Sequence, residues 1–163
     1  MSSIFYGISP LIVFLTICII LKKILVGICI ISPFISIRIY SGGYHASNYI
    51  LCFILSLSSL LALMCISKCN ISTTSLILLI FISLFTLAKY SPVIHYNNQV
   101  TDKELFIYKK RAIIICIFWI LICFLLLILS KKELFTACSS SIILSALSIL
   151  PCIHQKNSSR RHP

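Results

Sequence analysis

A histidine and a cysteine seven residues apart form the pattern in this sequence with the clearest potential for chemistry. His45 and Cys52 follow two adjacent glycines, Gly42 and Gly43, in the stretch RIYSGGYHASNYILC. An imidazole can take the proton of a thiol, and the resulting thiolate can attack a carbonyl carbon. The residue types therefore predict nucleophilic catalysis, with Cys52 as the nucleophile and His45 as the general base.

The spacing constrains how these two side chains could meet. On a continuous helix they would share a face, but they would lie about 10.5 Å apart along the axis. Proton transfer needs a separation of roughly 3 Å. We therefore expect His45 to lie on a non-helical segment, made possible by Gly42-Gly43, that folds back over the start of the helix carrying Cys52. The same pattern also fits a structural turn followed by a packed cysteine.

Nearby polar residues are candidates for supporting roles. Arg38 could bind a substrate carboxylate or stabilise the site through hydrogen bonds, and it could equally be an interfacial anchor at the end of an apolar run. Because no acid lies near His45 in the sequence, Asn48 or Ser47 is the candidate for orienting its imidazole. Farther along, Lys109, Lys110 and Arg111 could hold an acidic part of a peptide substrate or bind anionic lipid.

The composition excludes an ordinary soluble domain. The chain has 163 residues, 60% of them hydrophobic and 10% charged. Soluble domains are about 45–50% apolar and about 25% charged, so the lipid bilayer is the expected surroundings. The net charge is +11. The basic residues punctuate apolar runs, which is typical of membrane topology signals and not of a nucleic-acid surface.

The other cysteines predict packing and not a metal centre. The chain has nine cysteines, and no CxxC pair or four-ligand spacing is found among them. Inside an apolar run a cysteine behaves as a small hydrophobic residue. Five of them lie in such runs: Cys18, Cys29, Cys116, Cys123 and Cys138. The sequence therefore predicts no metal and no cofactor.

Apolar runs predict an all-α, polytopic membrane bundle of about six transmembrane helices. The predicted spans are 4–21, 24–37, 48–67, 74–90, 112–129 and 134–152. We expect residues 1–154 to form one membrane-embedded domain and residues 155–163 to form a disordered basic tail. Lys22-Lys23 predicts a tight hairpin between the first two spans, since two lysines at mid-bilayer would be costly.

The intervening sequences add two boundaries and an orientation. Ser91-Pro92 should end the fourth span, and the capping-box spacing at 101–104 should start a helix that continues into the fifth. With six spans both termini lie on one side. That side carries nine Lys and Arg and the other carries five. The excess places both termini, and the His45/Cys52 end, in the cytoplasm.

The frame R-x4-G-x-H-x6-C, formed by Arg38, Gly43, His45 and Cys52, resembles the motif of the accessory gene regulator B (AgrB) family. The run GGYHAS, which includes Gly42, is similar to clostridial-type members. The resemblance extends from about residue 11 to residue 152. It implies a cysteine endopeptidase of the bacterial cell membrane that cleaves a short pheromone precursor peptide and helps to form a thiolactone ring in quorum sensing. It also implies a homodimer.

A different class of protein remains an alternative at this point. A non-catalytic membrane transporter or scaffold would also be rich in apolar helices. A transporter favours ionisable residues inside its spans, and this chain has almost none there. The reactivity of Cys52 relative to the other cysteines discriminates between the classes, because only a catalytic thiol needs activation.

Overall fold

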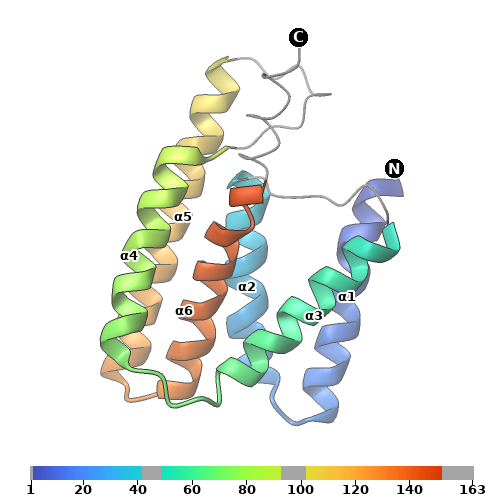
Figure 1. Cartoon of the computed structure of the whole chain (residues 1–163), viewed down its shortest axis with the longest axis vertical. Helices are drawn as coiled ribbons and strands as arrows, with labels where there is room; N and C mark the ends of the chain where they lie inside the picture. The colour runs from blue at the N-terminus through green and yellow to red at the C-terminus, as the bar shows by residue number, and fades with distance from the viewer. Residues whose placement is uncertain (1, 42–48, 93–101, 152–163) are drawn as a thin grey trace.

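The computed structural model describes residues 2–41, 49–92 and 102–151, and within these ranges all regular structure is helical (Figure 1). The helices are α1 (Ser2–Ile20), α2 (Ile24–Ser41), α3 (Tyr49–Ile66), α4 (Thr73–Tyr90), α5 (Asp102–Ile128) and α6 (Lys132–Leu147). The predicted all-α fold is confirmed for the described residues. The tail at 155–163 lies outside them.

Two helix boundaries differ from the predicted spans for identifiable reasons, whereas α5 begins at Asp102, within the helix start predicted at 101–104. α2 continues to Ser41, because an apolar run marks the hydrophobic part of a helix and a charged residue can extend it. α6 ends at Leu147 and not at residue 152. The Ile149 N–H donates to the Ala146 carbonyl, three residues earlier, at 3.2 Å, so a tighter turn follows at 148–149.

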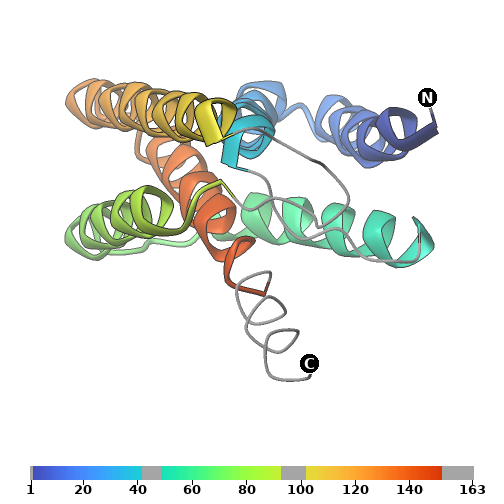
Figure 2. The same ribbon diagram turned by 90° about the horizontal axis from the view of Figure 1, so that it is seen from above.

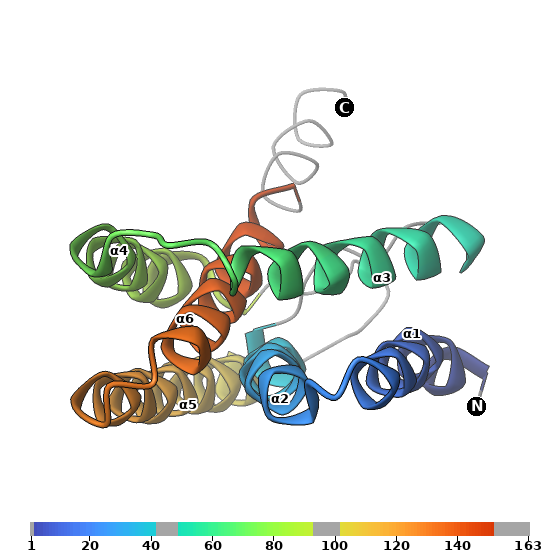
Figure 3. The ribbon, with the colours of Figure 1, turned by 90° about the horizontal axis from the view of Figure 1, so that it is seen from below.

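The helices form two rows with α6 between them. Viewed along the bundle, α5, α2 and α1 lie in one row and α4 and α3 in the other (Figures 2 and 3). α6 packs against α2, α3, α4 and α5. The last helix in sequence is therefore the centre of the bundle.

Small and hydroxylated side chains allow α6 to occupy this position. Ten of its residues are buried, including Ser139, Ser140, Ser141 and Ser145. Small residues let helices approach closely in a membrane, where apolar burial alone gives little drive for association. The Ser141 hydroxyl donates to the carbonyl oxygen of Ile30 in α2 at 2.6 Å. This hydrogen bond fixes α6 against α2 at mid-helix.

Two hydrophobic clusters hold the rows together. One lies where α2, α4, α5 and α6 meet, and the other lies where α1, α2 and α3 meet, with Ala137 of α6 at its edge. The prediction that cysteines act as packing residues is confirmed for four fully buried ones. They are Cys18, Cys116, Cys123 and Cys138. Cys29 is half-buried and packs against both clusters.

The outer surface of the bundle is apolar, as lipid contact requires. Phe81, Phe85, Ile114, Phe118 and Leu121 are more than half exposed on the outer helices. By length and composition, three helical stretches could cross a membrane: Ile24–Ser41, Thr73–Tyr90 and Lys103–Ile128. Ser9–Ile20 and Ile50–Ile66 are apolar but shorter. The number of six crossings stays a prediction.

The two ends of the bundle are built differently. At one end, which we call the hairpin end, lie the turns that join α1 to α2, α3 to α4 and α5 to α6 (Figure 1). The tight hairpin predicted at Lys22-Lys23 is one of them. At the other end, which we call the site end, α2 and α4 finish and α3 and α5 begin (Figure 1).

Candidate active site

Five of the predicted site residues lie outside the described part of the chain. They are Gly42, Gly43, His45, Ser47 and Asn48. Ser41 is the last residue of α2 and Tyr49 is the first of α3, so α2 directly precedes this segment and α3 directly follows it. The remaining members of the motif, Arg38 and Cys52, are described.

Arg38 and Cys52 line the same cavity, although they belong to different helices. Its volume is about 160 Å³, and its walls come from α2, α3 and the end of α6. The lining residues are Phe34, Arg38, Cys52, Leu55, Ser56, Ser59, Leu144, Ser148 and Pro151. The structure therefore brings together the two described residues that the sequence motif singled out.

Each wall of the cavity follows helical spacing. On α3, Ser56 and Ser59 follow Cys52 by one and two turns on the same face. From α6, Leu144, Ser148 and the following Pro151 repeat the same interval. The α3 residues could have been found by extending the face of Cys52 in helical steps. The α6 wall could not, because only the folded topology places it beside Cys52.

The Arg38 side chain is positioned by packing on an aromatic ring. Its guanidinium carbon lies 5.3 Å from the centre of the Phe34 ring, one turn earlier in α2. This is within the range of a cation–π interaction, which strengthens when water is scarce. Arg38 is half-buried, so the interaction directs its charge toward the cavity wall and not into the apolar surface.

The serines of the cavity offer hydrogen-bond acceptors. The Ser59 hydroxyl donates to the Ser56 carbonyl at 2.8 Å, and the Ser148 hydroxyl donates to the Ser145 carbonyl at 2.8 Å. With their protons directed to the helix backbone, both hydroxyl oxygens keep lone pairs available. A peptide N–H entering the cavity would find acceptors on two of its walls.

Cys52 differs from its neighbours on α3. It is half-buried at the cavity, whereas Cys65 is exposed near the far end of the same helix. Cys69 is exposed in the turn that follows. One helix and the turn after it therefore carry three thiols in different surroundings, which provides internal controls for any test of Cys52.

The predicted basic cluster lies beside the end of α2 that carries Arg38. The Arg111 guanidinium carbon lies 5.9 Å from the Tyr40 ring centre, and the Tyr40 and Tyr108 rings are 6.4 Å apart. Lys110 and Arg111 are exposed, and Lys109 is half-buried. These contacts join the first part of α5 to α2 at the site end.

Comparison with known proteins identifies the family. A sequence profile of accessory gene regulator B matches residues 1–149. The chain belongs to the AgrB family. No curated protein sequence and no solved structure matched the chain. The AgrB resemblance noted from the Arg38–Cys52 motif is thereby confirmed over nearly the whole chain.

Membership of the AgrB family assigns a biological process. AgrB proteins take part in processing the signalling peptide of quorum sensing, and they are associated with the membrane. The apolar outer surface and the three helices able to cross a membrane agree with that association. The cavity lined by Arg38 and Cys52 is the candidate site for this processing.

Proposed function

We propose that this AgrB protein is a membrane-embedded cysteine endopeptidase that cleaves a short precursor peptide and prepares it for ring closure. The observation that carries the proposal is that Arg38 and Cys52, far apart in the motif, line one cavity together. A motif that only marked a turn would not require its arginine and cysteine to face a common space.

In the first step His45 takes the proton of the Cys52 thiol, and the thiolate sulfur attacks the carbonyl carbon of a precursor peptide bond. A carbon–sulfur bond forms and the carbon–nitrogen bond breaks. Protonated His45 returns its proton to the leaving amine. The product is a thioester between the N-terminal part of the precursor and Cys52, and the C-terminal part is released.

In the second step a cysteine thiol of the bound precursor attacks the same carbonyl carbon. The new carbon–sulfur bond closes a thiolactone ring, and the Cys52 sulfur leaves and regains a proton. One thioester replaces another, so the step changes the bond energy little. Water must be excluded for the ring to form in preference to the free acid, and the half-buried position of Cys52 in an apolar bundle supports this requirement of the proposal.

Basic groups at the site end would bind the precursor. Arg38 lines the cavity and can donate to a carbonyl or carboxylate of the bound peptide. Lys110 and Arg111 are exposed and could attract an acidic C-terminal part. In this proposal six helices cross the bacterial membrane, the site end faces the cytoplasm, and the protein acts as a homodimer.

The decisive experiment compares two alanine variants on one helix. We expect Cys52→Ala to abolish cleavage of the precursor in cells while the protein still accumulates in the membrane. Cys65→Ala is the matched control, because Cys65 lies on α3 and lines no wall of the cavity. Normal cleavage by Cys52→Ala at normal abundance would refute the cysteine-peptidase proposal.

A second measurement needs no substrate. A water-soluble thiol reagent added to open membranes should label Cys52 faster than the more exposed Cys65. The labelling rate of an ordinary thiol follows its exposure, so a less exposed thiol can react faster only if it is activated. His45→Ala should remove this advantage. Labelling that follows exposure alone, with Cys65 ahead of Cys52, would favour a transporter or scaffold.

A further inference from the structure

A second large cavity lies at the hairpin end, away from Cys52. It has a volume of about 620 Å³ and is formed by the α1–α2 and α5–α6 hairpins. Lys22, Lys23, Lys131 and Lys132 line it together with one acid, Glu133. Neither the motif nor the proposed peptidase chemistry makes use of this cavity.

Two turns of the same type bring the lysines together. In the first, the Lys23 N–H donates to the Cys18 carbonyl at 2.8 Å around Lys22, whose φ is 54°. In the second, the Lys131 N–H donates to the Leu126 carbonyl at 3.0 Å around Ser130, whose φ is 57°. Both follow the Schellman pattern that ends a helix with one left-handed residue. The first turn therefore contains both Lys22 and Lys23, and the second contains Lys131 and is followed directly by Lys132.

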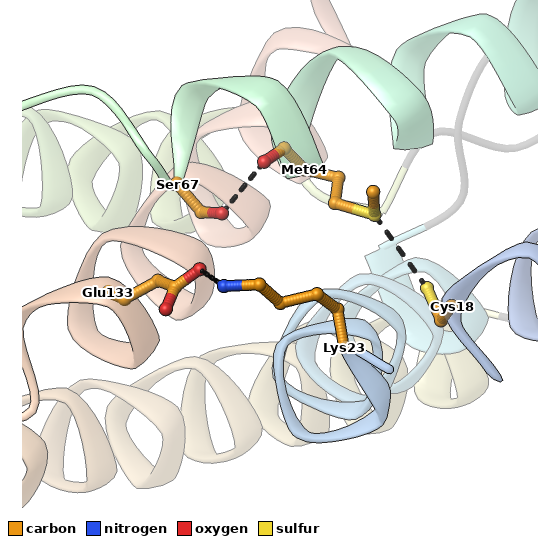
Figure 4. A network of polar contacts seen from close by, with 5 residues as sticks. All are labelled: Cys18, Lys23, Met64, Ser67 and Glu133. Carbon is orange, nitrogen blue, oxygen red and sulfur yellow. Dashed lines mark hydrogen bonds and ion pairs between the residues drawn. The ribbon is translucent and has the colours of Figure 1, made fainter. Parts of the chain in front are cut away.

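An ion pair joins the two hairpins and leaves excess positive charge. The Lys23 ammonium reaches from the start of α2 to the Glu133 carboxylate in the first turn of α6, at 2.5 Å (Figure 4). In the described part of the chain, no acid is paired with Lys22, Lys131 or Lys132. The wall of the cavity thus carries four positive charges and one negative charge.

The rest of the wall is apolar and opens toward the outside of the bundle. Ile19, Ile24 and Leu25 line the cavity and are 53%, 44% and 68% exposed. These side chains lie at the ends of apolar helices, where the hydrocarbon of a membrane meets its headgroups. A free anion would use only the lysines. A phospholipid would contact both the lysines and the apolar wall, with its phosphate at the lysines and an acyl chain along the isoleucines and leucine.

We propose that this cavity binds an anionic phospholipid and that the bound lipid holds the two hairpins together. Charge complementarity selects an anionic headgroup over a zwitterionic one. The apolar wall selects a lipid over a free phosphate. The ligand stabilises the folded bundle, because it binds the assembled hairpins and not the separated helices. The site is independent of the peptidase proposal, since it lies at the opposite end of the bundle from the Cys52 cavity.

The test measures lipid binding and thermal stability of the purified full chain in a neutral detergent. Phosphatidylglycerol and phosphatidylcholine with identical acyl chains are titrated separately, and glycerol 3-phosphate serves as the free-anion arm. The test variant is Lys22→Gln/Lys131→Gln. The control, Lys68→Gln/Lys89→Gln, removes the same charge from two lysines that do not line this cavity.

We expect phosphatidylglycerol to raise the melting temperature and phosphatidylcholine to leave it unchanged. The test variant should bind phosphatidylglycerol about 25-fold more weakly, as the product of two lysine contributions of roughly fivefold each. The control should bind as the wild type does. Equal effects of the two lipids, or equal losses in the two variants, would overturn the proposal. A full shift with glycerol 3-phosphate alone would overturn the lipid assignment in favour of a free anion.

Discussion

The two ends of the bundle use opposite means to place functional side chains. At the hairpin end, Lys22-Lys23 and Lys131-Lys132 are set by short turns whose hydrogen bonds span a few residues. At the site end, Arg38 and Cys52 meet a wall from the end of α6, about a hundred residues away in sequence. Local turns can position charge at a membrane surface. Placing a thiol beside a substrate pocket requires the whole bundle.

The largest effect should come from changing the chemistry of the site end without changing its shape. Cys52→Ser keeps the size of the side chain but replaces a thiol with a much weaker acid, which His45 activates poorly. We expect precursor cleavage to fall by about 10³-fold or more, measured as product per unit of membrane protein. Cleavage within a few fold of the wild type would show that Cys52 is not the nucleophile.

A smaller loss is expected when the charge beside the thiol is removed. Arg38→Ala should lower cleavage by about 10- to 100-fold, the range for hydrogen bonds to a charged group, without loss of protein. Lys89→Ala is the matched control, because Lys89 also lies over aromatic rings, 6.0 Å from Phe85 and 5.3 Å from Tyr90, but lines no described cavity. Equal behaviour of the two variants would make Arg38 an interfacial anchor only.

At the hairpin end the expected effects are on stability and not on cleavage chemistry. A Cβ added at Gly27 in α2 would lie 2.6 Å from the Cys18 sulfur in α1. Gly27→Ala should therefore destabilise the protein by about 1–3 kcal/mol, measured by unfolding in detergent. Cys18→Ala removes the obstructing sulfur, so the double variant should lose less than the sum of the single variants. Additive losses would show that the two helices do not pack this closely.

The smallest effect should be a gain in the free energy of unfolding. Ser130 adopts a left-handed conformation, with a φ of 57°, between α5 and α6. Glycine adopts this conformation without the strain of about 1–2 kcal/mol that another residue pays, but it also adds about 0.4–1 kcal/mol of entropy to the unfolded chain. Ser130→Gly should therefore stabilise the protein by a net amount of about 0.5–1 kcal/mol. Ser58→Gly is the control, because Ser58 is an exposed serine inside α3 and should lose stability instead. A loss in both variants would contradict the turn described here.

Local patterns in the sequence predicted much of the bundle. The apolar runs located all the described helices, and Lys22-Lys23 marked a tight hairpin because charge is excluded from the bilayer centre. The spacing at 101–104 indicated a helix start, and α5 begins at Asp102. Thr101, the capping residue itself, lies outside the described residues. Ser91-Pro92 marked the end of α4 at Tyr90.

The rest depends on contacts between distant segments. α6 is the least hydrophobic of the described helices, and its small residues indicate close packing without showing which helices it contacts. Ser148 and Pro151 line the Cys52 cavity only because α6 crosses between the two rows. The proximity of His45 to Cys52 also stays a prediction, because His45 lies outside the described residues.

The central place of α6 has a consequence for how the protein is made. A ribosome releases α6 after the other five described helices, including the four against which it packs. Until then the Ile30 carbonyl lacks its hydrogen bond from the Ser141 hydroxyl. The hydrophobic cluster between α2, α4 and α5 also lacks the side chains that α6 contributes. The arrival of α6 is thus the step that completes the packing of the described helices. A nascent chain arrested before Lys132 would be a loose set of inserted helices, open to the proteases that survey the membrane.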